Sequence, residues 1–331
     1  MKYVNLGHSG LKVSNLCLGT MTFGTPTWRK WVLDEQASLP VIQAAVDKGI
    51  NFIDLANFYS MGVSEEVVGR AIRHVNRDKL VLASKCFYPM SADVNDQGLS
   101  RKHIVSSVEA SLKRIGTDYL DLFVIHAFDP QTPMLETMQA LNDLIKAGKI
   151  RYIGASTMYT WQFVMMNEVA IRHDLTPFVS MQCQLNAAYR EEEREMIPYC
   201  IHEGKAVTPF SPLARGLLSG VEDSLRNKTD NFTSDQYGDE TSRSIARAVA
   251  QVAKERGVKS SQVALAWVVN RPGVTSTLIG VETEAQLDEN LAALDIQLTA
   301  EEMQVIDRCY TPCDVINDYN VNRIPRQAKV Q

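Results

Sequence analysis

Short apolar runs alternate with longer segments of helical periodicity along most of this chain, and no other feature constrains its fold as strongly. Uninterrupted apolar runs are typical of strands buried on both faces, and strands that alternate with helices form parallel sheets. The sequence therefore predicts an α/β protein, and eight such units favour closure into a (β/α)8 TIM barrel. The predicted strands are Leu16–Gly19, Asn51–Asp54, Leu80–Ser84, Leu122–Ile125, Ile150–Gly154, Phe178–Met181, Ala206–Thr208 and Thr277–Ile279.

The segments between these runs contain residues that begin and end helices. Gly49 follows the expected helix Ser38–Lys48 as a C-terminal cap, and Ser64 is expected to be the N-cap of the next helix. Pro133 suits the first helical position of Thr132–Ala147. Further helices are expected over Ser100–Arg114, Glu191–His202 and Thr241–Arg256, with extra helices over Ser260–Val269 and Ala300–Asp307.

The beginning of the chain predicts a β-hairpin. Two short extended runs, Tyr3–Leu6 and Leu11–Ser14, flank a turn of the sequence Gly-His-Ser-Gly. We expect this hairpin, residues 1–15, to cap one end of the barrel. Residues 1–331 are expected to form one domain, because α/β barrels routinely exceed 250 residues.

Three stretches match no regular element. Thr22–Leu33 and the polar Gly220–Asp239 predict long active-site loops, since long loops in compact domains are usually functional. Residues 311–331 predict an irregular C-terminal tail. The competing architecture is an open doubly wound sheet, which usually has G-x-G-x-x-G after its first strand, and this sequence has neither that motif nor a P-loop.

Composition limits the classes of partner. The net charge of −5 argues against nucleic acid, which requires a basic surface. No run of 18 apolar residues predicts a membrane span, and the N-terminus lacks the apolar stretch of a signal peptide. The six cysteines are scattered without a C-x-x-C pair, and Cys309 and Cys313 have no histidine nearby. We therefore expect a cytoplasmic protein with free thiols and no metal site.

Ionisable residues stand where three successive apolar runs end. Asp54 ends the second run, Lys85 follows the third, His126 follows the fourth, and Tyr59 lies five residues beyond Asp54. Each residue alone is more often structural: a cap, a solvated cation, or a packed ring. A barrel, however, places its active site at the C-terminal ends of its strands. Four such residues at consecutive strand ends therefore predict one catalytic cluster.

The cluster suits proton transfer coupled to hydride transfer. A free tyrosine has a pKa of about 10 and needs a nearby cation to react near neutral pH. Lys85 would supply that charge, Asp54 would keep it protonated, and His126 would hydrogen-bond a substrate carbonyl and share in a proton relay. An alternative, a barrel isomerase or aldolase with Lys85 as a Schiff base, requires an uncharged lysine, which Asp54 opposes.

Several motifs resemble those of the aldo-keto reductases. Gly49–Tyr59 resembles the first signature of that family, and Ser64–Gly69 continues it. Tyr119–His126 resembles the segment that delivers the family's histidine, and Lys146–Ser156 and Phe210–Leu218 are further matches. The resemblance extends from about residue 1 to about residue 310. It looks closest to the bacterial branch that is also similar to potassium-channel β subunits.

The resemblance implies a catalytic tetrad of Asp54, Tyr59, Lys85 and His126. It also implies an extended nicotinamide cofactor across the barrel mouth, NADP(H) by family default, with NAD(H) as the alternative. Ser156 and Gln182 would hold the carboxamide, Phe210 would lie under the nicotinamide, and Ser211, Leu213, Arg215 and Leu217 would line the pyrophosphate. Gly19, Thr20, Met21 and Asp54 would lie near the nicotinamide end, and Gly280, Glu282, Gln286 and Asn290 at the adenosine end.

The segment after the last strand bears on cofactor choice. Thr283 stands where this branch often has arginine, and two carboxylates, Glu282 and Glu284, flank it. Two interpretations stay open. The carboxylates complement a helix N-terminus, or Glu282 accepts hydrogen bonds from a free ribose diol. Helix N–H groups and Arg215 would still offer an anion site. We therefore predict relaxed specificity, with NADPH used and NADH well tolerated.

The substrate is expected to be a small carbonyl compound, reduced from aldehyde or ketone to alcohol. Aromatic loop residues favour aryl or apolar aldehydes, and we expect Phe23, Trp28, Tyr88 and Phe128 to form the pocket. The alternative is a cofactor-binding regulatory or scaffold protein, as the channel β subunits suggest. No long exposed apolar helix predicts an obligate partner, and oligomerisation stays open.

Overall fold

The computed structural model describes residues 1–221, 225–313 and 315, and it is built around a sheet of eight parallel strands. The strands lie in the order β10-β3-β4-β5-β6-β7-β8-β9. The N–H of Thr275 donates to Val207 O (2.8 Å) and that of Leu278 to Pro209 O (2.9 Å), which joins the two ends of the sheet. The predicted barrel is therefore confirmed, with strand bounds that differ from the predicted ones by a few residues. The strands are β3 (Leu16–Gly19), β4 (Phe52–Asp54), β5 (Val81–Cys86), β6 (Leu120–Ile125), β7 (Ile150–Ser156), β8 (Ser180–Gln182), β9 (Ala206–Val207) and β10 (Thr277–Ile279).

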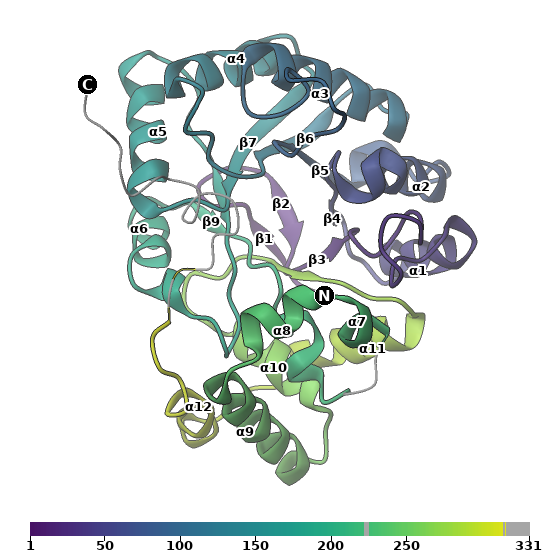
Figure 1. Cartoon of the computed structure of the whole chain (residues 1–331), viewed down its shortest axis with the longest axis vertical. Helices are drawn as coiled ribbons and strands as arrows, with labels where there is room; N and C mark the ends of the chain where they lie inside the picture. The colour runs from purple at the N-terminus through teal and green to yellow at the C-terminus, as the bar shows by residue number, and fades with distance from the viewer. Residues whose placement is uncertain (222–224, 314, 316–331) are drawn as a thin grey trace.

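Helices surround the barrel (Figure 1). Ser100 caps α3 by accepting from His103 N, and Gly116 ends that helix with a φ of 77°. No helix in the described ranges is long and apolar enough to cross a membrane. The surrounding helices are α1 (Glu35–Asp47), α2 (Val63–Ala71), α3 (Arg101–Ile115), α4 (Met134–Lys146), α5 (Thr160–Arg172), α6 (Met196–His202), α9 (Glu240–Arg256), α10 (Ser260–Val269), α11 (Glu284–Ala292) and α12 (Ala300–Asp307).

Several helix predictions need correction. Ser64 lies inside α2 rather than at its N-cap, because its hydroxyl donates to Thr20 O (2.8 Å) and ties the helix to the end of β3. Pro133 is the N-cap of α4 and not its first residue. The helix predicted over Glu191–His202 is divided into a 3-10 turn, η3 (Glu191–Glu193), and α6. No range was predicted for α5, and α11 was expected only as a helix that begins near Glu282 and Glu284.

The predicted loop Gly220–Asp239 contains two short helices, α7 (Leu225–Thr229) and α8 (Asn231–Tyr237). Asp230 separates them, and its carboxylate caps α8 by accepting from Phe232 N (3.3 Å). The loop prediction was wrong here because the polar composition of this stretch concealed a buried capping carboxylate. The other long loop, Thr22–Leu33, forms no helix and is joined at its ends by a bridge between Phe23 and Leu33.

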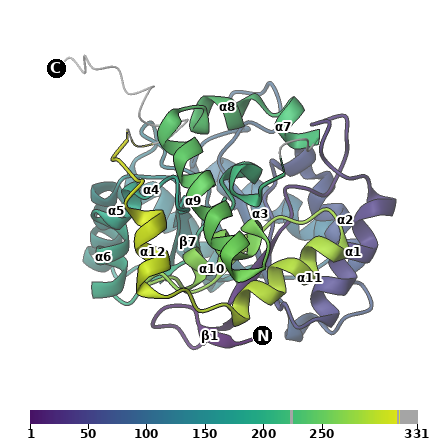
Figure 2. The same ribbon diagram turned by 90° about the horizontal axis from the view of Figure 1, so that it is seen from below.

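The hairpin of β1 (Tyr3–Asn5) and β2 (Lys12–Ser14) closes one end of the barrel, as predicted. Its side chains Leu6 and Val13 belong to a small core inside the barrel, with Phe52 and Leu122 among the strand residues. The larger core lies between the strands and the helices. Figure 2 shows β1 and the helices α7 and α8 at opposite ends of the molecule. The hairpin therefore leaves the mouth at the strands' C-terminal ends to the long loops.

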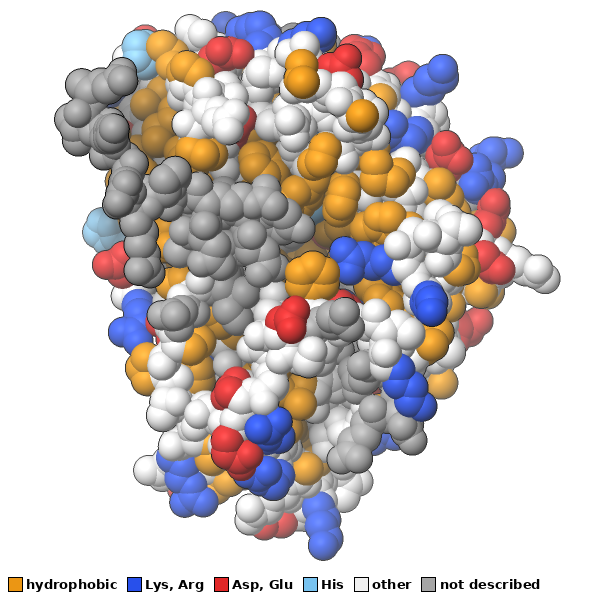
Figure 3. Space-filling model, in the orientation of Figure 1, with side chains coloured by type: hydrophobic (Ala, Val, Ile, Leu, Met, Phe, Trp, Pro, Cys, Tyr) orange, Lys and Arg blue, Asp and Glu red, His pale blue; other side chains and the backbone are white. Residues whose placement is uncertain are grey.

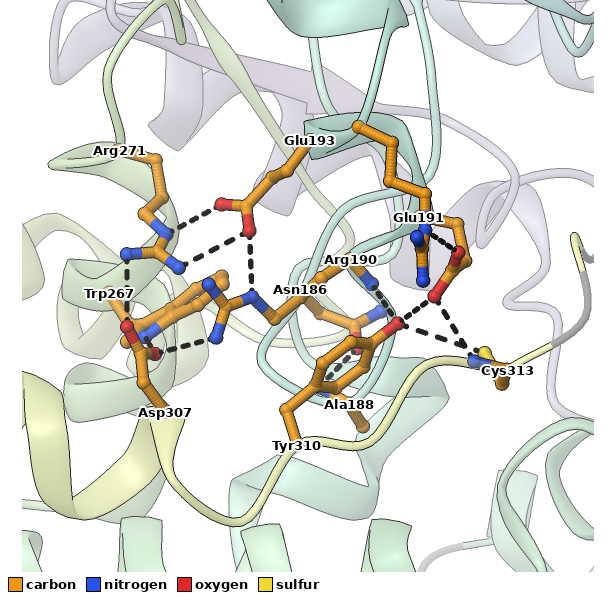
Figure 4. A network of polar contacts seen from close by, with 11 residues as sticks. Asn186, Ala188, Arg190, Glu191, Glu193, Trp267, Arg271, Asp307, Tyr310 and Cys313 are labelled. Carbon is orange, nitrogen blue, oxygen red and sulfur yellow. Dashed lines mark hydrogen bonds and ion pairs between the residues drawn. The ribbon is translucent and has the colours of Figure 1, made fainter.

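A polar network fastens α12 to the loop after β8 (Figure 4). Arg190 donates to Glu193 (2.7 Å) and pairs with Asp307 (3.0 Å), while Arg271 reaches the same two carboxylates at 2.8 and 3.2 Å. The indole N–H of Trp267 also donates to Asp307 (2.8 Å). These half-buried pairs position the loop that follows β8 and the segment after α12.

Candidate active site

The predicted tetrad comes together at the barrel mouth. Asp54 ends β4, Lys85 lies near the end of β5, His126 follows β6, and Tyr59 begins the 3-10 turn η1 (Tyr59–Gly62). Lys85 Nζ donates to Asp54 Oδ2 (2.6 Å), to the carbonyl of Leu55 (2.8 Å) and to Tyr59 Oη (3.3 Å). Asp54 and Lys85 are 1% and 0% exposed, so their ion pair is shielded from water.

The lysine carries a positive charge in this setting. Burial opposes the charge, but the Asp54 carboxylate and the Tyr59 oxygen outweigh it and raise the pKa of Lys85. All three hydrogens of a protonated ammonium have acceptors among Asp54, Leu55 and Tyr59. A Schiff-base role is therefore not favoured, because it requires an unprotonated amine.

The tyrosine remains a phenol. Burial raises the pKa of Tyr59, and the Asp54 charge adds to this, although Lys85 acts in the opposite direction. From the sequence we predicted that the Lys85 charge would lower the pKa of Tyr59, but desolvation of the phenolate outweighs that charge. A protonated Tyr59 whose oxygen accepts from Lys85 still has its own hydrogen to donate toward the mouth.

The histidine is neutral. Burial lowers the pKa of His126 well below its ordinary value, and the Lys85 charge lowers it further. Its ring packs edge-on against Tyr59 with centroids 5.8 Å apart. Nδ1 is buried and has no hydrogen-bond partner among the described residues. A neutral ring can donate one hydrogen bond to a carbonyl oxygen beside the Tyr59 hydroxyl.

A chain of aromatic rings extends from the tetrad. Tyr88 contacts His126 (4.8 Å between centroids), Phe58 contacts Tyr88 (5.0 Å), and Trp28 contacts Phe58 (5.7 Å). Phe87 also packs against Tyr88 (5.2 Å). Figure 3 shows hydrophobic side chains gathered in the middle of the face seen in Figure 1. Sequence reasoning missed Phe58, although its position directly before Tyr59 placed it at the mouth.

Two predicted pocket residues lie elsewhere. Phe23 is fully buried and belongs to the main core, so we withdraw it from the pocket. Phe128 is 7% exposed and packs against Trp161 of α5 (6.2 Å), which places it at the side of the mouth near β7. Trp28 and Tyr88 remain in the chain of rings.

The predicted nicotinamide-end residues all lie near strand ends. Gly19 ends β3, Thr20 and Met21 follow it, Ser156 ends β7, and Gln182 ends β8. Both the N–H and the hydroxyl of Thr20 donate to Asp54 O (3.0 Å each). The amide of Gln182 donates to Asp54 Oδ1 (2.9 Å), a contact that the sequence did not predict. Gln182 therefore satisfies the second oxygen of the buried carboxylate.

The segment after β9 has an unusual backbone. Phe210 is half-buried, and beyond it Ser211, Ala214 and Arg215 adopt φ values of 54°, 48° and 56°. Left-handed conformations of non-glycine residues cost free energy and gather at functional sites. Alternating left- and right-handed residues also form concave nests of backbone N–H groups that bind anions. The predicted pyrophosphate residues Leu213, Arg215 and Leu217 lie in or next to the 3-10 turn η4 (Ala214–Ser219).

The predicted adenosine-end residues surround the start of α11. Gly280 follows β10, and Thr283 is the N-cap of α11, accepting from Gln286 N (3.2 Å). The side chain of Gln286 accepts from Glu282 N (2.7 Å), and Asn290 is buried on the same helix. The threonine at position 283 is therefore explained by its role as the N-cap of α11.

The end of the described chain returns to the mouth. Tyr310 Oη donates to Glu191 (2.6 Å), and Cys313 N donates to the same carboxylate (3.1 Å), as Figure 4 shows. Val315 then lines a small cavity of about 20 Å³ with Phe210 and Glu192. The predicted irregular tail 311–331 lies mostly outside the described residues.

A cavity of about 310 Å³ lies elsewhere. It is lined by the C-terminal parts of α2 and α3, with Gly69, Arg73 and Lys113 among its residues. In a barrel these helix ends lie at the face opposite the strands' C-terminal ends. The cavity is therefore separate from the tetrad.

Fold and site together define a class of enzyme. A closed (β/α)8 barrel holds a buried Lys–Asp pair, a protonated tyrosine and a neutral histidine at its catalytic face. Such an arrangement suits the reduction of a carbonyl group.

The chain belongs to the aldo/keto reductase family, whose model matches residues 15–311. It is an NAD(P)H-dependent enzyme that reduces aldehydes or ketones to alcohols. It is 41% identical to the versiconal hemiacetal acetate reductase of Aspergillus parasiticus, over 94% of this chain and 98% of that protein. It is 43% identical to an aldo-keto reductase of Fusarium vanettenii (94% and 91%) and 40% identical to a candidate aryl-alcohol dehydrogenase of Schizosaccharomyces pombe (95% and 97%).

These relatives revise one expectation. All three come from fungi, so they do not support the predicted placement in the bacterial branch similar to potassium-channel β subunits. Their names describe reductases and dehydrogenases, which favours the enzyme over the regulatory or scaffold alternative.

Proposed function

We propose that Tyr59 is the proton donor of carbonyl reduction. Lys85 and Asp54 support Tyr59 electrostatically, and His126 hydrogen-bonds the substrate carbonyl. When bound, the nicotinamide supplies a hydride to the carbonyl carbon. The carbonyl oxygen lies between Tyr59 Oη and His126, accepts a hydrogen bond from each, and takes the proton from Tyr59. Lys85 limits the cost of the resulting phenolate, and Asp54 keeps Lys85 charged. The hydrogen bond of 2.6 Å between Lys85 and Asp54, in a site shielded from water, is the observation that carries this proposal.

The residues present fit an extended dinucleotide. Gly19 leaves little room for a side chain, since a Cβ there would approach Ile279 O to 3.3 Å. Phe210 offers a half-buried ring, and the left-handed residues Ser211, Ala214 and Arg215 offer backbone N–H groups for phosphate. We propose that Ser156 and Gln182 hold the carboxamide, and that Gly280, Gln286 and Asn290 lie at the adenosine.

We propose that NADPH is used and that NADH is well tolerated. Glu282 is half-buried near the proposed adenosine site, and burial raises the pKa of its carboxyl. An acidic group there opposes a 2′-phosphate and can accept from a ribose hydroxyl instead. The measurement is kcat/KM for both cofactors with one aldehyde. A preference for NADPH above roughly a thousandfold, about 4 kcal/mol, would contradict relaxed specificity.

We propose aryl aldehydes as the substrate class. The ring chain of Trp28, Phe58 and Tyr88 ends on His126, so a flat apolar group would stack beside the tetrad. Two of the relatives named above carry names that refer to aromatic or hemiacetal substrates. The test is a panel of 4-nitrobenzaldehyde, aliphatic aldehydes and phosphorylated sugars. Turnover of phosphorylated sugars alone would refute the assignment.

We also propose a cytoplasmic location, with neither nucleic acid nor a membrane as a partner. All six cysteines lie among the described residues, and none is in a disulfide, as suits a reducing compartment.

A further inference from the structure

The cavity of about 310 Å³ lies at the C-terminal parts of α2 and α3, two helices that pack side by side (Figure 1). The 3-10 turn η2 (Arg77–Lys79) and Leu80, directly before β5, contribute another wall. Pockets that bind small molecules typically measure about 300–1,000 Å³, so this cavity has room for one small ligand. None of the residues assigned above to catalysis or to the cofactor lines it.

The cavity combines an apolar wall with charged side chains. The apolar wall consists of Ile72, Leu80 and Ile115, which are between 3% and 7% exposed, and of the half-buried Val75. The charged residues that line the cavity are five cations and one carboxylate: Arg70, Arg73, Arg77, Lys113, Arg114 and Glu66. A ligand that fits both kinds of surface has an apolar body and a negative charge.

One of the five cations, Arg77, is fully used by the fold. Its Nε donates to Thr117 Oγ1 (3.0 Å), its Nη1 to Leu80 O (3.0 Å) and its Nη2 to Tyr119 O (2.8 Å). It also pairs with the carboxylate of Asp121 at 2.7 Å. Arg77 therefore builds the wall of the cavity and has little capacity left for a ligand.

Two further cations have carboxylate partners. Arg114 donates from Nε to Glu65 at 2.6 Å, and the Glu65 side chain is fully buried. Arg70 pairs with Glu35 and, at 3.7 Å, with Glu66, the one carboxylate that lines the cavity. These pairs neutralise both guanidinium groups and all three carboxylates, so they neither attract nor repel an anion strongly.

The remaining two cations, Arg73 and Lys113, are exposed at the rim. Within residues 1–221, 225–313 and 315, neither of them pairs with a carboxylate. Cations near a helix C-terminus also complement the helix dipole, but that effect requires no cavity. The other charged residues that adjoin the lining segments in the sequence do not line the cavity, namely His74, Asp78, Lys79 and Asp118.

We propose that this cavity binds a small organic phosphate. Arg73 and Lys113 contact the phosphate group, and the apolar wall contacts the carbon skeleton. A phosphate monoester carries a charge of about −1.5 to −2 near neutral pH and has three strong acceptor oxygens, so it suits two unpaired cations, whereas a carboxylate suits one. The ligand class is therefore a phosphate monoester with an aromatic or aliphatic body.

The test uses phenyl phosphate as the probe and inorganic phosphate as the comparison. Binding to the full chain is measured by isothermal titration calorimetry, with and without saturating NADP⁺. We expect phenyl phosphate to bind with a Kd below about 1 mM and more tightly than inorganic phosphate, because only the former contacts the apolar wall. Arg73→Gln and Lys113→Gln should each weaken both probes about three- to tenfold, as for charged hydrogen bonds at a partly exposed site. Val75→Ala should weaken phenyl phosphate alone, by about two- to fourfold.

The matched control is Lys102→Gln, which removes an exposed cation from the first turn of the same helix α3 and should leave both probes unchanged. The Tm of each variant shows that it is folded. Unaltered binding in both Arg73→Gln and Lys113→Gln would overturn the proposal, and so would an equal loss in Lys102→Gln. Loss of phenyl phosphate binding on saturation with NADP⁺ would place the probe at the barrel mouth, which also overturns it.

Discussion

Replacement of Tyr59 by phenylalanine separates the chemical role of this residue from its packing. The change removes one hydroxyl and keeps the ring that contacts His126. Among the described residues that hydroxyl has a hydrogen bond from Lys85 (3.3 Å), and in the variant Lys85 keeps Asp54 at 2.6 Å and Leu55 O at 2.8 Å. The free energy of unfolding should therefore fall by no more than about 1 kcal/mol.

The effect on catalysis should be much larger. Loss of a positioned proton donor typically slows a reaction by about 10²–10⁴-fold, which corresponds to an activation free energy higher by roughly 3–5 kcal/mol. The assay is kcat for 4-nitrobenzaldehyde, with cofactor affinity from fluorescence titration and the free energy of unfolding from urea denaturation. Tyr199→Phe, which alters a ring packed on Phe163 outside the mouth, is the matched control. A Tyr59→Phe variant that retains near-normal kcat would show that another group donates the proton.

Further predictions concern the other ionisable groups. Lys85→Met should abolish reduction. Because it leaves Asp54 buried without its partner cation, it should also lower the free energy of unfolding, measured by urea denaturation, by about 3–5 kcal/mol. The double variant with Asp54→Asn should recover part of this loss of stability. Borohydride should trap no aldehyde-dependent adduct on Lys85, and an adduct there would contradict the hydride mechanism. Since the pKa of Tyr59 is raised, the rate of reduction should not fall until the pH passes the ordinary tyrosine range, which a pH–rate profile measures. Burial, with the neighbouring Glu191 charge, raises the pKa of Glu192 to about 7. The folded protein therefore favours the neutral carboxylic acid, and the folded state loses stability as Glu192 ionises between about pH 4 and pH 7. Glu192→Gln should therefore raise the Tm at pH 8 but not at pH 4, and equal effects at both pH values would refute this.

The sequence alone predicted the eight strands and the ionisable residues that gather at the barrel mouth. Apolar runs buried on both faces are a local property, and each of the eight predicted strands is present. Asp54, Lys85 and His126 were readable because a barrel places every strand's C-terminal end at one mouth. Their convergence follows from topology and does not require detailed packing.

Tertiary structure decided the features that depend on side chains far apart in the chain. Gln182 completes the partners of Asp54 across 128 residues, and burial outweighs Lys85 in setting the pKa of Tyr59. Desolvation and long-range charge pairing depend on what surrounds a group in space, and periodicity along the chain contains no information about that.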